Sequence, residues 1–232
     1  MACILHLETS TDVCSVSLSE DGASLFTKED FNGPSHAVTL GVFVDEVLSM
    51  ADSAGKPLDA VAFSCGPGSY TGLRIGASMA KGICYGRNLP LIALPTLKVL
   101  SVPVLLNDEL PEEALLCPMI DARRMEVYTA MYDANLQQVV PIEAKIIDGE
   151  SWQAERAEHE IYFFGDGAMK CEAVLAGEHT HFVPDIVPKA AAMAALAERL
   201  DEQAIVKDKA LAYFDPLYIK EFIPAPSHVK GL

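Results

Sequence analysis

The chain has 232 residues, with 17 basic and 33 acidic side chains, so its formal net charge at pH 7 is −16. Half of the residues are hydrophobic, which is enough for a sizeable core and excludes a disordered chain. A protein that grips nucleic acid through its phosphates carries a basic stripe. The only adjacent basic pair here is Arg123 and Arg124, with Glu126 close behind. We therefore expect this chain to meet a more basic protein partner rather than to bind nucleic acid through a main surface of its own.

The six cysteines are scattered, with no C-x-x-C pair, and most lie in apolar runs where cysteine behaves as a small hydrophobe. We expect neither a disulfide framework nor a metal cluster from them. The N-terminus lacks the basic region of a signal peptide. No stretch approaches the roughly 20 apolar residues that a membrane helix needs. These features predict a cytoplasmic protein that does not engage a membrane.

The first predicted elements form an antiparallel meander. Residues 2–7 are an apolar run typical of a buried strand, and residues 13–19 alternate as a half-exposed strand does. After a turn, residues 23–28 complete the meander. A helix follows over residues 36–51, for which Ser35 is the expected N-cap.

A strand at residues 60–64 leads into a glycine-rich loop, a helix over residues 72–86 and a short strand at 91–93. The loop reads Gly-Pro-Gly-Ser-Tyr-Thr-Gly-Leu-Arg-Ile-Gly over residues 66–76. Glycine turns between a strand and a helix direct free N–H groups to one place, which suits a phosphate. This spacing nevertheless matches neither the Walker A nor the dinucleotide motif.

The loop therefore has two interpretations, a structural turn or an anion site, and no adjacent lysine or acid supports a metal–phosphate pair. The structural interpretation is favoured. Arg74 would bind an anion or pair with an acidic residue of a partner. The candidate residues of the loop are Gly66, Gly68, Ser69, Thr71, Gly72 and Arg74.

The second half of the chain repeats the opening pattern. Residues 115–121 form an apolar run that ends in an acid, as residues 4–8 do, and an alternating stretch follows. Glu8 and Asp121 end these runs and are predicted to face a common cleft, where paired carboxylates position a hydrated cation or act as acid and base. The alternative, which we favour, is that each carboxylate hydrogen-bonds the turn that follows it.

The loop resembles the signature GPGSFTGLRIG of the bacterial TsaB (YeaZ) family, with Tyr70 in place of the usual Phe. Glu8 stands where the family usually has Asp. Residues 135–211 carry no matching motif. The other matching segments, in family order, are residues 4–10, 35–37, 89–91, 94–97, 120–128 and 216–219.

The resemblance implies an α/β fold of two ribonuclease H-like lobes with the actin/Hsp70/sugar-kinase (ASKHA) architecture, in which mixed sheets flanked by helices surround a nucleotide cleft. We expect an N-terminal lobe over residues 1–105, which holds the glycine loop and the interface helices. A smaller C-terminal lobe would span 106–232, with its last residues packing back on the first lobe. Pro103 and residues 107–111 mark this boundary.

The resemblance also implies the role of the chain. The catalytic relatives in this glycoprotease-like superfamily, the TsaD transferases, carry two metal-binding histidines one turn apart. Here His36 is followed by Leu40 at the second position, so we expect no catalytic residue and no metal. The chain would be a non-catalytic scaffold or regulatory subunit in tRNA threonylcarbamoyladenosine biosynthesis.

The expected partners are a TsaD-like transferase and a TsaE-like ATPase, with a homodimer when the chain is alone and tRNA contacted only indirectly. ATP or ADP would bind only at the complex. The helix over residues 36–51 is apolar on more than one face, and the helix over residues 72–86 combines apolar residues with a stripe of small ones. This pattern is typical either of a well-buried interior helix or of a helix buried against another lobe or subunit, and the resemblance implies the second. The small residues Gly72, Gly76 and Ala80 would allow close helix approach. The predicted interface residues are His36, Val38, Val42, Met79 and Ile83.

Two other functions stay open. A small ATP-binding phosphotransferase or ATPase of the same fold would use Glu8, Asp121 and the glycine loop. A metallopeptidase would need a metal, which Leu40 counts against. His179 and His181 share one face of a predicted strand, but no third ligand is evident, so they are interpreted as surface histidines.

Overall fold

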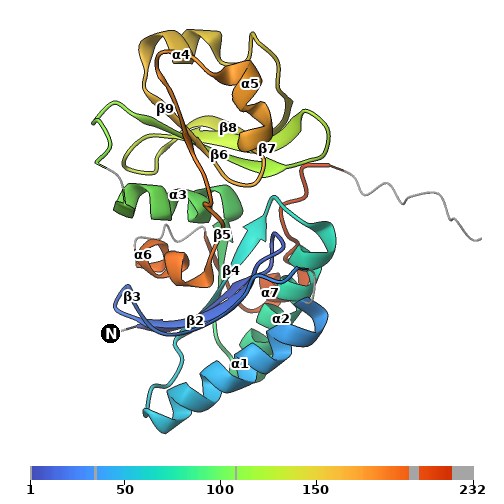
Figure 1. Ribbon diagram of the computed structural model, residues 1–232. Coiled ribbons are helices and arrows are strands. Elements are labelled where there is room, and N and C mark those ends of the chain that lie inside the picture. The colour runs from blue at the N-terminus through green and yellow to red at the C-terminus, as the bar shows by residue number, and fades with distance from the viewer. Residues whose placement is uncertain (1, 34–35, 108, 199–203, 221–232) are drawn as a thin grey trace, which may run out of the picture.

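Two mixed sheets, one in each lobe, form the framework of the computed structural model, which describes residues 2–33, 36–107, 109–198 and 204–220 (Figure 1). The first sheet has the order β11-β5-β4-β1-β2-β3 and the second β10-β9-β6-β7-β8. The strands of the first sheet are β1 (Cys3–Glu8), β2 (Cys14–Glu20), β3 (Ala23–Asp30), β4 (Ala60–Gly66), β5 (Leu91–Pro95) and β11 (Ile205–Val206). Those of the second are β6 (Leu115–Asp121), β7 (Glu126–Tyr132), β8 (Gln138–Ile146), β9 (Ile161–Phe164) and β10 (Thr180–Val183).

The two sheets share one topology. In the first, β1 pairs antiparallel with β2 and parallel with β4, β2 pairs antiparallel with β3, and β4 pairs parallel with β5. In the second, β6, β7, β8, β9 and β10 pair in the same order and the same directions. The predicted fold of two ribonuclease H-like lobes is therefore confirmed, and β11 adds an antiparallel strand at the edge of the first sheet.

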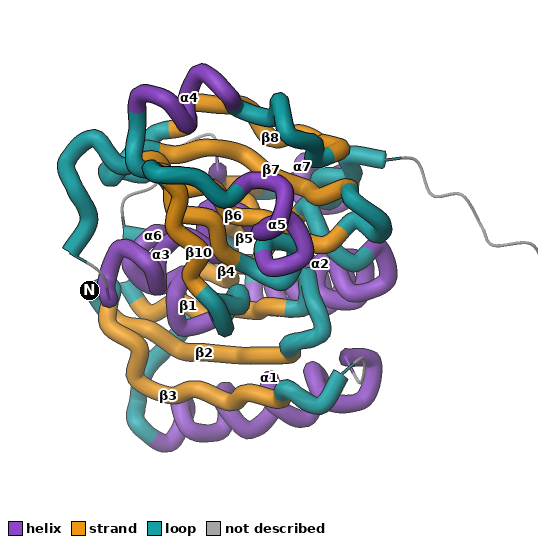
Figure 2. The backbone as a smooth tube through the Cα atoms, turned by 45° about the horizontal axis from the view of Figure 1, so that its top comes forward, coloured by secondary structure: helices purple, strands orange, loops and turns teal. Residues whose placement is uncertain are grey.

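Helices cover both faces of the first sheet and separate it from the second. On one face lie α1 and α2, and Figure 2 shows α1 running along β2 and β3. On the other face lie α3 and α6, and α3 also packs against the second sheet. The helices are α1 (His36–Ser53), α2 (Tyr70–Arg87), α3 (Thr96–Asn107), α4 (Gln153–Glu158), α5 (Glu172–Leu175), α6 (Met193–Ala197) and α7 (Lys209–Tyr213), with short 3-10 turns η1 (Met169–Cys171) and η2 (Ala190–Ala192).

The glycine loop ends in a well-formed helix start. Ser69 is the N-cap of α2, its hydroxyl accepting the Gly72 N–H at 3.3 Å, and Asn88 closes the helix in the left-handed conformation. The helix begins two residues earlier than predicted and ends one residue later. The expected cap of α1, Ser35, lies outside the described residues.

Strand β2 differs from the sequence-based prediction of a half-exposed strand. All its residues up to Ser19 are buried, including the serine face. The Ser15 hydroxyl accepts the Ala190 N–H at 2.8 Å, and Ser19 bonds the buried ring of His6 at 2.6 Å. The serines are buried because segment η2, more than 170 residues away, covers them.

The chain returns to the first lobe after β10. Strand β11 pairs with β5, α7 contacts α2, and the Leu217 N–H donates to the Cys65 carbonyl at 2.7 Å. The boundary expected between residues 105 and 106 falls within the last turn of α3. In the described part of the chain, no helix has the length and apolar character needed to cross a membrane.

Candidate functional site

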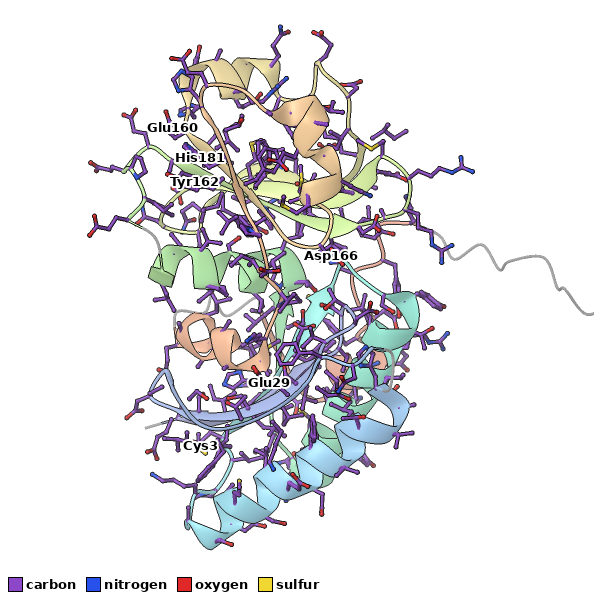
Figure 3. All side chains as sticks on the ribbon, viewed as in Figure 1. Cys3, Glu29, Glu160, Tyr162, Asp166 and His181 are labelled. Atoms are coloured by element: carbon purple, nitrogen blue, oxygen red, sulfur yellow. The ribbon has the colours of Figure 1, made fainter. Side chains whose placement is uncertain are left out.

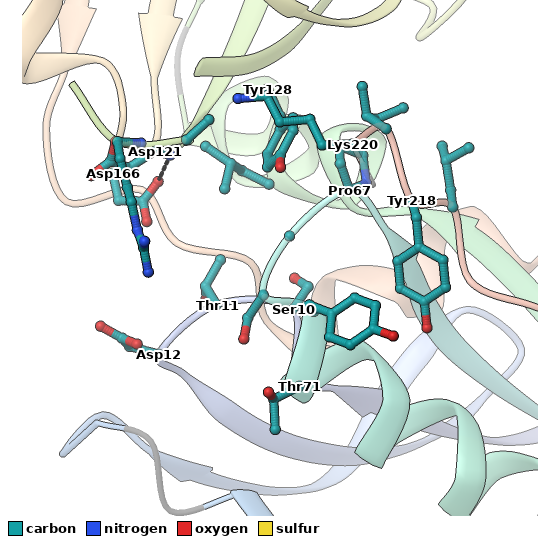
Figure 4. Close-up of a pocket in the computed structure, with 18 residues that line it drawn as sticks. Ser10, Thr11, Asp12, Pro67, Thr71, Asp121, Tyr128, Asp166, Tyr218 and Lys220 are labelled. Carbon is teal, nitrogen blue, oxygen red and sulfur yellow. Dashed lines mark hydrogen bonds between the residues drawn. The ribbon is translucent and has the colours of Figure 1, made fainter. Parts of the chain in front are cut away.

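A cleft of about 680 Å³ lies between the two lobes (Figure 4). The turn after β1 and the glycine loop form its first-lobe side, and the turn after β6 with Asp166 forms the other. The C-terminal residues 217–220 complete the wall. Its polar lining residues include Ser10, Thr11, Asp12, Ser69, Thr71, Asp121, Arg123, Asp166 and Lys220.

Two glycine loops, one in each lobe, shape this cleft in the same way. After β4, a Cβ at Gly68 would lie 2.2 Å from the Ser10 carbonyl oxygen. After β9, a Cβ at Gly167 would lie 3.0 Å from the Asp121 nitrogen. Only glycine lets each loop pack so closely on the turn after the first strand of its lobe. The sequence reasoning missed the second loop, although Gly-Asp-Gly directly after the apolar run 161–164 was a usable signal.

Of the two predicted cleft acids, Glu8 does not line the cleft. Its side chain is fully buried, and Oε1 accepts the Ser10 N–H at 2.6 Å and the Ser10 hydroxyl at 2.5 Å. Burial raises the pKa of Glu8 despite these hydrogen bonds. The carboxylate therefore holds the turn after β1 and offers no exposed oxygen to a ligand.

Asp121 does line the cleft, with its side chain 46% exposed. Its Oδ1 accepts the Arg123 N–H at 2.8 Å and also bonds the ammonium of Lys170. Partial burial opposes its ionisation, but the bonds from Lys170 and Arg123 outweigh this and lower the pKa of Asp121. Both acids thus bond the turn that follows them, as the favoured alternative predicted.

Asp166 and Asp12 are cleft acids that the sequence reasoning missed. The Oδ1 of Asp166 accepts the Asp121 N–H at 2.9 Å, and Figure 4 shows Asp166 beside Asp121 and across the cleft from Asp12. Burial raises the pKa of Asp166, and the neighbouring carboxylates of Asp121 and Asp12 raise it further. The second-lobe wall therefore presents two acids joined through a backbone hydrogen bond.

The remaining residues of the first glycine loop divide between the cleft and a neighbouring groove. Ser69 and Thr71 line the cleft, whereas Gly72 packs on Thr9, whose hydroxyl donates to the Gly72 carbonyl at 2.8 Å. Arg74 faces the groove, where its guanidinium donates to the Tyr70 hydroxyl at 3.0 Å. Within the described residues, Arg74 has no carboxylate partner.

This second depression, which we call the α1–α2 groove, has a volume of about 820 Å³. It is lined by Ala37, Tyr70, Thr71, Arg74, Ile75, Ser78, Met79, Gly82 and Ile83. Two predicted interface residues, Met79 and Ile83, are half-buried in its wall. On α1 beside it, Val38 is 77% exposed and Val42 is 52% exposed. Of the five predicted interface residues, Met79 and Ile83 therefore line the groove, and Val38 and Val42 are exposed on α1, next in sequence to the lining residue Ala37 and to Gly41, which contacts Met79.

His36, the fifth, is buried and cannot contact a partner. Its Nε2 donates to the Thr11 carbonyl at 2.7 Å, which ties the start of α1 to the turn after β1. Leu40, one turn later, is buried in the core of the first lobe. The His36 side chain thus stabilises the fold rather than facing outward.

The small-residue stripe that was predicted for helix approach also faces inward. A Cβ at Gly76 would lie 2.4 Å from the Thr9 hydroxyl oxygen, and Ala80 is fully buried. A second stripe at the same four-residue spacing faces outward instead: Ser78, Gly82 and Gly86 are exposed. A Cβ at Gly82 or Gly86 would meet nothing within 4 Å. Spacing alone does not distinguish the two stripes.

Two lobes of one topology around an inter-lobe cleft define a protein of the actin/Hsp70/sugar-kinase class. The family described as TsaD, tRNA N6-adenosine threonylcarbamoyltransferase, matches residues 32–223. The chain belongs to this family and, within it, to the TsaB (YeaZ) proteins, as the sequence motifs predicted.

Named relatives support the assignment. The chain is 35% identical to the tRNA threonylcarbamoyladenosine biosynthesis protein TsaB of Haemophilus influenzae over 54% of this chain and 51% of the relative. It is 30% identical to the Bacillus subtilis protein of the same name, over 60% of this chain and 59% of that relative. The matches thus span between half and three fifths of these relatives. YeaZ from Pseudomonas aeruginosa superposes with a TM-score of 0.74 at 25% identity, covering 94% of this chain and all of that one.

Proposed function

We propose that this chain is a non-catalytic subunit of tRNA threonylcarbamoyladenosine biosynthesis that binds a TsaD-type transferase through the α1–α2 groove. The names of its relatives support the pathway, and the exposed apolar groove supports the mode of action. A TsaE-like ATPase would join the assembly, and tRNA would be contacted indirectly. In this proposal any ATP or ADP binds at the complex and not to the chain alone.

The groove is the observation that carries the proposal. An apolar side chain left in water costs free energy that burial against a partner recovers. Val38 and Val42 stand exposed on consecutive turns of α1, and Met79 and Ile83 continue the apolar surface on α2. The outward stripe of Ser78, Gly82 and Gly86 leaves room for the backbone of a partner helix.

The charge of the groove indicates which end of a partner helix it receives. At the start of the two helices, His36 of α1 lies beside Gly72 of α2. Further along both helices, Gly41 of α1 lies beside Met79 of α2, so the two helices run in the same direction. Neither helix has an acid in its first turn, and α2 carries no acid at all. Two positive helix ends and the guanidinium of Arg74 therefore lie together. We propose that the transferase places a carboxylate or a helix C-terminus there.

The two alternative functions have less support. A phosphotransferase using Glu8 would need that carboxylate in the cleft, and it is buried beneath the cleft. A metallopeptidase would need His36 as a ligand, and its Nε2 is held by the Thr11 carbonyl. Among the described residues, no group of three or more His, Cys, Asp or Glu side chains is arranged to hold a metal ion.

The proposal is tested by placing a charge in the groove. Val42→Asp should abolish binding to the TsaD-like protein of the same host, measured by calorimetry, because a buried unpaired carboxylate is strongly unfavourable. Val139→Asp on β8 is the matched control, since Val139 is 53% exposed but lies in the other lobe. Binding that survives Val42→Asp, or that is lost equally with Val139→Asp, would contradict the proposal.

A further inference from the structure

Lys170 supplies the cleft with a positive charge from within the chain. Its ammonium bonds Asp121 Oδ1 and donates to the Glu126 carbonyl oxygen at 2.7 Å. Carboxylate and carbonyl oxygens are the ligands that Mg²⁺ and Ca²⁺ prefer. Both of these oxygens are already engaged, because Oδ1 also accepts the Arg123 N–H and the Glu126 carbonyl also accepts the Ala122 N–H at 3.1 Å. The ammonium of Lys170 occupies the position between these two oxygens that a divalent cation would take, so the residues present do not fit a cation bound at this position.

We infer that Lys170 is a built-in counter-ion that replaces a divalent cation in this cleft and keeps Asp121 from acting as a metal ligand or a general base. This inference goes beyond the proposed function, since it concerns the cleft and not the groove. A ligand that enters this cleft would therefore bind without a metal ion between it and Asp121.

The backbone around Lys170 is built to deliver its side chain to this place. Gly165 has a φ of +102°, and a Cβ there would lie 2.3 Å from the Met119 carbonyl oxygen. With Gly167 it lets the loop after β9 lie directly against the end of β6. The 3-10 turn η1 then places Lys170 on Asp121 with its side chain only 25% exposed. Holding a long side chain so firmly costs conformational entropy, which a freely solvated lysine would not lose.

One of the other charges of the cleft, that of Lys220, is also paired within the chain. Lys220 pairs with the Glu126 carboxylate and lies 5.9 Å from the centre of the Tyr128 ring. Asp166 bonds the backbone of Asp121, and Arg123 lines the same wall. The remaining acid, Asp12, faces them from the first lobe (Figure 4). Removing Lys170 alone would leave Asp121 without its ion-pair partner, and Asp166 without the cation that acts on its carboxylate.

Titration with Mn²⁺, followed by electron paramagnetic resonance at low ionic strength, tests the inference. Lys170→Met keeps the length of the side chain and removes its charge. We expect this variant to bind Mn²⁺ about tenfold or more tightly than the wild type, and Asp121→Asn added to it should abolish the gain. Lys145→Met is the control, since it removes another lobe-two lysine, one that pairs with Glu143 and not with Asp121.

No gain in Lys170→Met, or an equal gain in Lys145→Met, would overturn the inference. If Lys170→Met does not fold, the wild type and Asp121→Asn decide the matter. Glu126→Gln removes a second lysine-paired carboxylate of this wall and is the reference for the effect of the lost charge. The inference requires that Asp121→Asn weaken Mn²⁺ binding no more than Glu126→Gln does. A clearly larger loss with Asp121→Asn would identify Asp121 as a metal ligand and overturn the inference.

Discussion

At the scale of single residues, polar side chains that looked like candidates for chemistry mostly hold backbone in place. Glu8 accepts two bonds from Ser10, and His36 donates to Thr11. The residue types and their positions at strand and helix ends were predictable. Their burial was not, because it depends on which distant segments pack over them. Exposure therefore separates Asp121, which lines the cleft, from Glu8, which does not.

His179 and His181 give a second example. The sequence showed no third partner, but β9 and β10 pair side by side and bring Glu160 between them. The carboxylate bonds His179 Nδ1 at 2.7 Å through one oxygen and His181 Nε2 at 2.5 Å through the other. Tyr162 stacks on His181 with ring centres 4.5 Å apart (Figure 3). Glu160 precedes His179 by 19 residues and His181 by 21 residues, so no local sequence pattern reveals this cluster.

This cluster predicts a pH dependence of stability. The hydrogen bond to Glu160 raises the pKa of His179, to which the nearby Glu178 also contributes. A raised histidine pKa stabilises the folded state fully below the ordinary value of 6.5, and this stabilisation is lost as the pH rises through the folded-state pKa. Glu160→Gln should therefore reduce the free energy of unfolding more at pH 6 than at pH 8.5.

Chemical denaturation at both pH values measures this difference. Glu158→Gln is the control, because it removes an exposed carboxylate two residues away without touching either histidine. An effect of Glu160→Gln that is the same at both pH values, or that is matched by Glu158→Gln, would show that the histidines do not gain stability from Glu160.

At the scale of elements, hydrophobic pattern predicted most strands and both long helices, but it did not predict which faces are covered. The serine face of β2 is buried because η2 lies on it. On α2, the two stripes of small residues have the same spacing, yet one packs on Thr9 and the other faces solvent. Packing partners from other parts of the chain decide such cases, so tertiary structure was needed to find the outward stripe.

We expect glycine-to-alanine substitutions in the two stripes of α2 to have opposite effects on stability. Gly82→Ala should stabilise the protein by about 0.5–1 kcal/mol, because alanine restricts the unfolded chain and its Cβ meets nothing. Gly76→Ala should destabilise it by roughly 1–3 kcal/mol, because the new Cβ would overlap the Thr9 side chain. Urea unfolding measures the change in the free energy of unfolding for each variant. Changes of the same sign in both variants would show that packing does not distinguish the two stripes.

At the scale of the whole molecule, the duplicated topology and the order of the motifs made the two lobes predictable. The C-terminal segment was less so. It crosses from the first lobe, where Tyr218 packs on Tyr70 with ring centres 5.0 Å apart, to the second, where Lys220 pairs with Glu126. Residues 217–220 thus line the cleft and link its walls. Residues 135–211 matched no motif, although they contain the loop that places Asp166 and Lys170.

The cleft and the α1–α2 groove are neighbouring depressions with different side-chain chemistry. Tyr70 and Thr71 line both depressions, so the first turn of α2 is their common wall. In the cleft, Asp121 pairs with Lys170, and Lys220 pairs with Glu126. In the groove, Met79 and Ile83 are only half-buried, and Arg74 bonds the Tyr70 hydroxyl but no carboxylate among the described residues. This contrast agrees with the proposal that the chain acts by binding a partner.

The native mass of the wild-type chain mixed with the TsaD-like protein of the same host, compared with each protein alone, tests this account most directly. We predict a one-to-one complex that forms at the expense of any homodimer of this chain. Two proteins that keep their separate masses in the mixture would contradict the proposed function.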